Sequence, residues 1–356
     1  MGLEHIEPEN LHIRSWGLVA DGITFTSTFK HGQVLFGKRR AYQRKVAVAD
    51  FDGVCSSDIY VFESKDPQVL LPELVPFILQ SEGFYEYAVK TSAGSLSPRT
   101  NWTHLANYEF PLPPVDEQRR IADLLWAADD SITEYENATE KLYSVFSSKA
   151  NGFFANLQQK NVPIEKLKDL CSQPIVNGIF RRRKDFGEGI PLVNVTDIYS
   201  AFRVDETHLD RVRANENEQE RFSAKPGDVI FNRSSLVFDG IGHACLIPET
   251  QEPLVFECHL MRVRPDRKKV LPEYLARLSL AKYGRSYIES VARKTTMTTM
   301  NQQDLNNMPI LVPDLDQQKL IAEQLDDIEQ KIEEVKKHIE VLRKLKSQML
   351  NKLLTN

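Results

Sequence analysis

Apolar positions repeat with a helical period in two long stretches of the chain, each stepping by four and three residues. The first stretch comprises Ile121, Leu125, Ala128, Ile132, Tyr135, Thr139, Leu142, Phe146, Lys149 and Phe153, and the second comprises Ile321, Leu325, Ile328, Ile332, Val335, Ile339, Leu342, Lys346, Met349 and Leu353. This spacing is typical of a coiled-coil seam. We therefore expect two helices of about 40 residues, each roughly 60 Å long.

Both stretches begin with the same motif, repeated 200 positions apart. Its members Pro113, Asp116, Gln118, Ile121, Ala122 and Leu125 recur as Pro313, Asp316, Gln318, Ile321, Ala322 and Leu325. Shorter matches precede this motif. Residues 71–73 and 271–273 both have the sequence Leu-Pro-Glu, and Gly32 and Gly227 each begin a similar apolar run. The chain therefore reads as a tandem duplication of one module. Since both helices belong to one chain, the seam is predicted to be intramolecular and antiparallel.

Short apolar runs between these stretches predict strands. In the first module, residues 32–37, 45–49 and 54–62 are expected to be strands, with Asp52-Gly53 as a turn before the third. Residues 71–89 show the period of a helix. The second module repeats the order. The predicted fold class is α+β, a tandem duplication of a mixed α/β domain followed by a long helix, with the two helices forming an antiparallel coiled coil.

The repeat divides the chain into four parts. They are a first domain at residues 1–112, a helix at 113–157, a second domain at 158–310 and a helix at 311–356. Matching Gly32 to Gly227 leaves the first module without a counterpart of about residues 164–195. Either the first domain lacks its opening strands, or the start of the chain is displaced from the natural one.

Composition indicates an ordinary cytoplasmic globular protein. Apolar residues make up 41% and charged residues 27% of 356 positions. The most apolar stretch, residues 70–79, is too short to cross a membrane, and residues 1–11 do not resemble a signal peptide. The four cysteines are scattered, which fits a reducing compartment. Two of them lie near histidines (His243 with Cys245, Cys258 with His259), but no tight pair of metal ligands exists, so no metal site is expected.

The motifs of the obvious enzyme classes are missing. No Gly-x-x-x-x-Gly-Lys-Ser/Thr loop for ATP occurs, and Pro113-Pro114 lacks the polar and aromatic neighbours that an adenine methyltransferase places around a flipped base. Asp58 and Glu63 faintly resemble a nuclease metal site, but on a strand they would point to opposite faces. We therefore expect a chain that is not catalytic.

Although the net charge is −5, basic residues cluster outside the two predicted long helices, which are rich in acidic residues. Candidate DNA-binding residues in the first module are Lys38, Arg39, Arg40, Tyr42, Gln43, Arg44, Arg99 and Asn101. Those in the second module are Arg181, Arg182, Arg183, Arg233, Ser234, Ser235, Lys294 and Thr296. Arginine and lysine neutralise phosphates, and arginine, asparagine and glutamine can also read base edges. Each residue alone fits a solvated charged face equally well, but together the clusters favour a nucleic acid.

The two modules agree in their helices, while their β-rich parts agree only at structural positions. Such a scaffold suits two readers of different sequences. The motif Pro111-Leu-Pro-Pro-Val-Asp-Glu-Gln-Arg-Arg-Ile-Ala122 and its echo at 313–322, together with Gly32-Gln-Val-Leu-Phe-Gly37, resemble the specificity subunit of type I restriction-modification systems.

This resemblance implies two target-recognition domains, each reading one half of a bipartite site in double-stranded DNA, held apart by the helix pair. It also implies two modification subunits, which bind S-adenosylmethionine and methylate adenine, and restriction subunits, which use ATP and Mg²⁺. The chain itself is expected to bind no cofactor. Two alternatives stay open: a DNA-reading subunit of another methylase-containing phage-defence assembly, and a coiled-coil module that binds other proteins. A complete methyltransferase is a third, disfavoured by the missing motifs.

Overall fold

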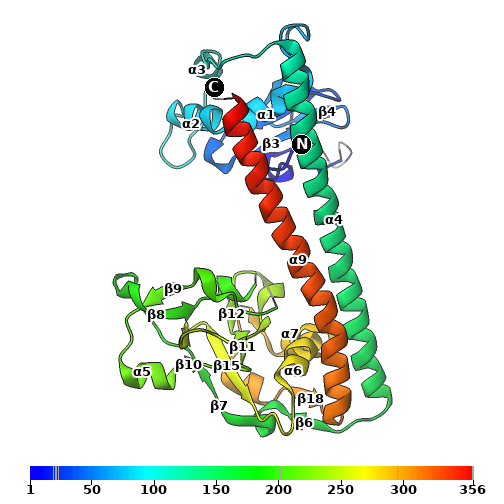
Figure 1. Ribbon diagram of the computed structural model, residues 1–356, viewed down its shortest axis with the longest axis vertical. Helices are drawn as coiled ribbons and strands as arrows, with labels where there is room; N and C mark the ends of the chain where they lie inside the picture. Colours follow the sequence, from blue (N-terminus) through cyan, green and yellow to red (C-terminus); the bar gives the residue numbers. More distant parts are fainter. Residues whose placement is uncertain (19, 21, 23, 200–201, 295, 355–356) are drawn as a thin grey trace. The chain divides into compact units, whose positions relative to one another are not determined.

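The computed structural model describes residues 1–354 apart from 19, 21, 23, 200, 201 and 295, with the side chains of Leu353 and Leu354 also left out. The chain forms two compact units, one comprising Met1–Asn137 with Lys336–Asn356 and the other Ala138–Val335. The long helices α4 (Val115–Gln159) and α9 (Leu315–Leu354) each contribute one part to each unit (Figure 1). The predicted α+β tandem architecture is confirmed. No helix among the described residues is both long enough and apolar enough to cross a membrane.

The two long helices pair in an antiparallel sense within each unit. In the first unit, Lys346 donates to Asp129, and the His338 ring stacks on Tyr135 with centroids 5.8 Å apart. In the second unit, Phe146 and Ile328 belong to one buried core. Residue numbers rise along one helix as they fall along its partner, which confirms the predicted antiparallel pairing.

The predicted seam is correct along most of α9, although near its end Leu350 is buried and Met349 only half-buried, and it is partly wrong on α4. Ile321, Leu325, Ile328, Ile332, Ile339 and Lys346 of α9 are buried, as their positions in the seam predict. On α4, however, Tyr135 and Lys149 are exposed, and Ala150 and Phe154 are buried instead. An α-helix has 3.6 residues per turn, so a strict heptad drifts around its surface. The last turns of α4 therefore present Ala150 and Phe154 to the core of the second unit. The side chain of Leu353 lies outside the described residues.

The first unit contains two small sheets covered by short helices. The three-stranded sheet has the order β3-β2-β5 and the two-stranded sheet pairs β1 with β4, all antiparallel. Buried aromatic residues such as Phe36 and Phe77 fill its core. The elements are η1 (Leu3–His5), β1 (Ser27–Phe29), β2 (Val34–Gly37), η3 (Ala41–Gln43), β3 (Val46–Val48), β4 (Gly53–Cys55), β5 (Ile59–Phe62), η4 (Pro72–Leu74), α1 (Val75–Gln80), α2 (Glu82–Lys90) and α3 (Trp102–Leu105).

Two elements of the first unit differ from the expectation. The strand predicted at 54–62 is two strands in different sheets, because the chain turns where Ile59 N donates to Ser56 O at 2.9 Å. Asp52-Gly53 therefore does not join paired strands. The helix predicted at 71–89 is interrupted at Ser81, whose extended backbone ends α1 and whose hydroxyl accepts from Phe84 N to cap α2.

The second unit contains the same arrangement with additional strands. Its sheets have the orders β13-β11-β15-β7, β10-β14-β8-β9, β12-β17-β16 and β18-β6. The strands are β6 (Ile164–Lys166), β7 (Cys171–Asn177), β8 (Phe186–Val193), β9 (Asp210–Val212), β10 (Ser223–Ala224), β11 (Val229–Asn232), β12 (Ser234–Ser235), β13 (Ala244–Leu246), β14 (Leu254–Phe256), β15 (Leu260–Pro265), β16 (Arg293–Lys294), β17 (Thr298–Thr299) and β18 (Pro309–Leu311). The helices are η5 (Leu167–Leu170), η6 (Arg183–Asp185), η7 (Thr196–Ile198), η8 (Glu206–His208), α5 (Glu216–Arg221), η9 (Phe238–Gly240), α6 (Pro272–Leu280), α7 (Lys282–Val291) and α8 (Gln302–Asn306).

The first unit repeats this fold without its opening strands. Its sheet β3-β2-β5 corresponds to β13-β11-β15, and its pair β1-β4 to β10-β14. The described residues of the first unit contain no counterpart of β7 or β8. Ser56 N donates to Met1 O at 2.9 Å, as Glu257 N donates to Val193 O at 3.1 Å. Met1 thus occupies the position of Val193 in the second unit.

One glutamine of the repeated motif ties each long helix to its own domain. Gln118 accepts a hydrogen bond from Leu71 N at 2.9 Å and donates to Val69 O at 2.8 Å. Gln318 accepts from Leu271 N at 2.8 Å and donates to Lys269 O at 3.0 Å. Because Gln118 and Gln318 are buried and meet main-chain groups at matching positions, this residue type is required at both.

Candidate nucleic-acid interface

In the first unit the predicted DNA-binding residues gather where two loops meet. The loop after β2 lies against the loop before α3, because Arg40 N donates to Pro98 O at 2.7 Å and Thr100 N donates to Lys38 O at 2.9 Å. Arg39 and Arg99 form an isolated antiparallel bridge between the loops. The pairing brings Arg39, Arg40 and Arg99 together although they are distant in sequence. We refer to this pair of loops, residues 38–40 and 97–100, as the first reading loop.

Two side chains hold the three guanidinium groups of the first reading loop. The Asp58 carboxylate accepts from Arg99 Nε at 2.9 Å and from Arg39 Nη1 at 3.4 Å. The Ser97 hydroxyl accepts from Arg39 Nη2 at 3.1 Å and from Arg40 Nε at 3.2 Å. The Asp58 side chain is 16% exposed, whereas those of Arg39 and Arg99 are 40% and 56% exposed. The anion therefore lies beneath, and the cations extend into solvent.

The backbone of this region adopts a conformation that is uncommon for residues other than glycine. Arg40 and Arg44 flank η3 with φ of 54° and 53°, both in the left-handed region. Such conformations cluster at functional sites, where surrounding contacts impose them. Here the Arg40 N–H bond to Pro98 O and the Arg44 N–H bond to Ala41 O hold the chain in this shape.

The remaining candidates of the first unit divide into exposed and occupied groups. Tyr42 is 54% exposed, Gln43 is half-buried, and the Lys38 ammonium lies 4.6 Å from the centre of the Tyr60 ring. Asn101 caps α3 by accepting from Thr103 N, so its amide oxygen is engaged in the fold. Arg44 points elsewhere: it donates to Glu82 at 2.6 Å and lines a cavity of about 370 Å³ beside the helix pair. That hydrogen bond lowers the pKa of Glu82.

In the second unit the candidates around β12 form a second pair of loops. Ser234 pairs with Thr299 and Lys294 pairs with Thr298 in the sheet β12-β17-β16. The Lys294 ammonium lies 4.1 Å from the centre of the Phe238 ring, and Thr296 is exposed. Ser234 and Ser235, by contrast, are 6% and 8% exposed. DNA contact by these two serines stays a prediction. We refer to residues 233–235, 294 and 296–299 as the second reading loop.

The two reading loops are built at equivalent positions. Lys38 N donates to Asp58 O at 3.0 Å, and Arg233 N donates to His259 O at 2.9 Å. Thr100 N donates to Lys38 O and Met300 N to Arg233 O, both at 2.9 Å. Lys38 therefore corresponds to Arg233, and Asp58 to His259.

Sequence reasoning missed the roles of Asp58 and His259. The matching place of both residues just before β5 and β15 is the signal that could have found them. In the sequence, Asp58 and Glu63 faintly resembled the metal ligands of a nuclease. In the structure, the Glu63 carboxylate accepts a hydrogen bond from Gln33 Nε2 at 2.6 Å, and the Asp58 carboxylate accepts from Arg99. The two carboxylates therefore have separate partners.

The basic run at residues 181–183 follows a segment that pairs with residues 256–257. Ile179 N donates to Phe256 O at 2.8 Å, which places the loop leading to Arg181 against the turn at residues 257–260. Arg181 itself is engaged, since it donates to Glu218 at 2.7 Å and to Arg213 O at 2.8 Å. Arg182 and Arg183 are exposed.

The turn at residues 257–260 also brings together three potential metal ligands. One ligand atom each from Glu257, Cys258 and His259 lies within 4.8 Å of the others. His259 Nδ1 is 2.5 Å from the Ser234 hydroxyl, so this ring nitrogen is engaged with the protein. His243 and Cys245 do not join the group; burial and the charge of Arg285 lower the pKa of His243 to about 4. The expected absence of a metal stays a prediction.

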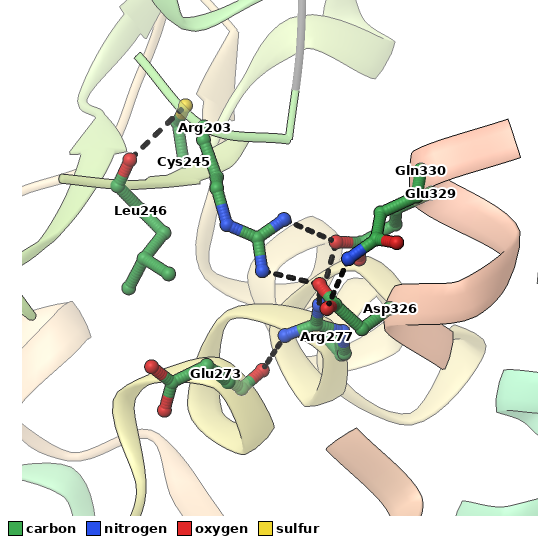
Figure 2. A network of polar contacts seen from close by, with 8 residues as sticks. All are labelled: Arg203, Cys245, Leu246, Glu273, Arg277, Asp326, Glu329 and Gln330. Atoms are coloured by element: carbon green, nitrogen blue, oxygen red, sulfur yellow. Dashed lines mark hydrogen bonds and ion pairs between the residues drawn. The ribbon is translucent and has the colours of Figure 1, made fainter. Parts of the chain in front are cut away.

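A buried polar network joins α9 to the second domain. Figure 2 shows Arg203 and Arg277 around Asp326 and Glu329; Arg277 donates to Glu329 at 2.5 Å and to Asp326 at 2.9 Å. Burial raises the pKa of Glu329 to about 7, against the opposing effect of the two arginines. At the matching site of the first unit, Asp129 of α4 contacts His12 at 2.9 Å and Lys346. Each unit thus fixes its helices through a buried acid.

Comparison with known proteins finds similarity along most of the chain. Residues 19–142 and 160–343 match the family model of the type I restriction modification DNA specificity domain. The type I restriction enzyme EcoDI specificity subunit of Escherichia coli is 30% identical over 158 residues, which cover 40% of this chain and 34% of that subunit. The MjaVIII specificity subunit of Methanocaldococcus jannaschii is 22% identical over 342 residues, covering 91% of this chain and 76% of that one.

The fold is shared with a solved structure. The type I restriction-modification S subunit from M. genitalium superposes with a TM-score of 0.58 at 14% sequence identity, covering 99% of this chain and 91% of that one. At this identity the likeness extends to the fold alone. The EcoDI match spans only about a third of the E. coli subunit.

Proposed function

This chain belongs to the family of type I restriction-modification DNA specificity domains, and from that premise we propose that it is the subunit of such a complex that reads double-stranded DNA. The observation that carries the proposal is that the family model matches both modules separately. The reading loops, built at equivalent positions, support it. Each module then recognises one half of a bipartite site.

The exposed arginines of the reading loops supply the chemistry for this task. A guanidinium group donates two parallel hydrogen bonds to guanine O6 and N7 in the major groove, and it also neutralises phosphate. Arg39 and Arg99 extend into solvent from a carboxylate that fixes them, so they are pre-oriented for contact with base edges. In the second module, Arg233, Lys294 and Thr296 take the matching role, with Arg182 and Arg183 beside them. Different residues at equivalent positions would let the modules read different sequences.

The chain acts without catalysis and without a cofactor of its own. Two modification subunits supply S-adenosylmethionine and methylate adenine, and restriction subunits supply the chemistry that needs ATP and Mg²⁺. The exposed faces of α4 and α9 serve as the docking surface for the modification subunits. The assembly works in the cytoplasm.

Methylome sequencing of cells with and without this gene tests the proposal. We expect methyladenine at one bipartite motif to disappear when the gene is deleted and to return when it is supplied again. Unchanged methylation would contradict the proposal and favour a coiled-coil module that binds other proteins. Loss of methylation at a continuous, undivided motif would contradict the assignment of one half-site to each module.

A further inference from the structure

The equivalent residues Asp58 and His259 lie against the two reading loops, with side chains that are 16% and 48% exposed. Each follows a turn: Ile59 N donates to Ser56 O at 2.9 Å, and Leu260 N donates to Glu257 O at 3.0 Å. The Asp58 carbonyl accepts a hydrogen bond from Lys38 N, and the His259 carbonyl accepts one from Arg233 N; Lys38 and Arg233 are the first residues of the two reading loops. The fold therefore presents one side chain at the same place in both modules, next to the residues proposed to meet DNA.

In the first module this side chain is an anion with two cationic partners. Asp58 contacts Arg99 at 2.9 Å and 3.4 Å and Arg39 at 3.4 Å. Without it, Arg39, Arg40 and Arg99 would repel one another, and the neutral Ser97 would link only Arg39 and Arg40. Each long arginine side chain also loses entropy when it is fixed for base recognition. Asp58 supplies that fixation before DNA arrives.

In the second module the same place holds an uncharged or cationic ring instead. His259 Nδ1 lies 2.5 Å from the Ser234 hydroxyl, and the Arg233 guanidinium donates to Cys258 O at 3.4 Å. Ser234 is buried, whereas the His259 side chain is 48% exposed, so the ring holds this buried hydroxyl from the surface of the unit. The two modules thus share the position and differ in its chemistry, as readers of different half-sites require.

We propose that Asp58 and His259 are positioning residues that set the sequence specificity of the two half-sites, Asp58 by orienting Arg39 and Arg99 and His259 by orienting Ser234 and its loop. This inference rests on the proposed function. It assigns to each module a specificity determinant that acts by placing its neighbours. Because the two residues belong to different modules, changing one should alter one half of the target only.

Methylome sequencing of cells that hold the modification subunits and a variant chain tests the proposal. With Asp58→Asn, one half-site should become degenerate at one or two positions. Discrimination there should fall on the order of tenfold, as expected for a misplaced bidentate arginine. The other half-site should stay intact. With His259→Ala, the opposite half-site should become degenerate.

Two control variants separate positioning from simpler effects. Glu63→Gln removes one negative charge from the same unit without touching the first reading loop, and it should leave the motif unchanged. Cys258→Ala removes a potential metal ligand beside His259 but keeps the Ser234 contact, and it should also be silent. A motif relaxed equally by Glu63→Gln would show that net charge, not position, is responsible. Relaxation by Cys258→Ala would point to a bound cation instead.

The outcomes also distinguish this inference from the proposed function. If the unaltered chain directs no bipartite methylation, the proposed function fails. If it does and both variants leave the motif unchanged, or either relaxes both halves, the positioning role is wrong. Asp58→Glu, which keeps the charge but shifts the carboxylate, should relax the same half-site as Asp58→Asn. Binding of the purified complex to duplexes mismatched in one half provides the same readout if methylation by a variant is too weak to measure.

Discussion

At the scale of single residues, the first reading loop predicts a specific loss of DNA affinity. Arg39→Ala should weaken binding of the assembled complex to its target duplex by roughly 1–3 kcal/mol, the contribution of one good bidentate contact. If Arg39 contacts a phosphate instead, a plot of log affinity against log salt concentration should become shallower, its slope decreasing in magnitude by about one. Fluorescence anisotropy over a range of salt concentrations measures both.

Lys65→Ala is the matched control, because Lys65 is an exposed cation of the same unit outside the reading loop. It should change neither the affinity nor the salt slope. Equal behaviour of the Arg39 and Lys65 variants would contradict the assignment of this loop to DNA.

A second residue-scale prediction concerns the buried acid Asp129. The hydrogen bond to Asp129 raises the pKa of His12, outweighing burial, and the charge of Asp130 adds to it while Lys346 opposes it. Burial alone would raise the pKa of Asp129, but His12 and Lys346 together lower it. A raised histidine pKa gives stability that is complete below about pH 6.5 and is lost as pH rises through the higher folded value.

The thermal unfolding midpoint of the first unit should therefore decline between pH 6 and pH 8.5 more steeply in the unaltered chain than in His12→Gln. Differential scanning calorimetry of the chain in complex with its modification subunits measures this difference. Parallel pH profiles for the two proteins would show that the His12 contact is not a stabilising ion pair.

At the scale of elements, the motif glutamines should stabilise the two units separately. Gln118→Ala leaves the buried Leu71 N–H without a partner, which costs about 1–3 kcal/mol. Gln318→Ala should have the same effect on the second unit through Leu271. Hydrogen exchange followed by mass spectrometry should show faster exchange around the altered site only. Faster exchange in both units from one substitution would contradict separate anchoring.

The polar network of Figure 2 gives another prediction at this scale. Arg277→Met should destabilise the second unit by about 3 kcal/mol, because it leaves Glu329 buried with less compensation. Adding Glu329→Gln should recover much of this loss, since the uncompensated charge is then removed. Denaturant unfolding of the two single variants and the double variant measures the coupling. Simple addition of the two single effects would show that the residues do not act as a pair.

Periodic patterns predicted the long elements well and the short ones less well. The repeated motif located both long helices, because an apolar seam and its first-turn residues are local properties of a helix. The split between β4 and β5 was not predicted, since strand pairing depends on distant partners such as β1 and β2. The drift of the α4 seam likewise depends on what the second domain presents to Ala150 and Phe154.

Sequence reasoning proposed the candidate site from its cations and missed the two residues that hold them and their loops. Basic clusters identified Arg39, Arg99 and Arg233 from composition alone. Nothing in composition distinguishes Asp58 from other aspartates, because its role arises only when two loops meet around it. For the same reason, the sequence could not show that Arg44 pairs with Glu82 and that Arg181 pairs with Glu218.

At the scale of the whole molecule, duplication accounts for the two readers that we propose for one chain. The helices keep the same motif and the same glutamine anchors, whereas the reading loops change residue by residue at equivalent positions. An aromatic pair in the first unit, buried Phe77 with half-buried Trp126, corresponds to the ion pair Arg277 with Asp326 in the second. The scaffold therefore tolerates exchange of its inner contacts while it keeps its architecture.

The most direct test of two separate readers is binding of the assembled complex to four duplexes. These carry the intact bipartite motif, a scrambled first half, a scrambled second half, or both halves scrambled. We expect a large loss of affinity when either half is scrambled, and the loss from the half read by the first unit should shrink in Arg39→Ala. Equal affinity for all four duplexes, or a loss from only one of the two halves, would contradict the account.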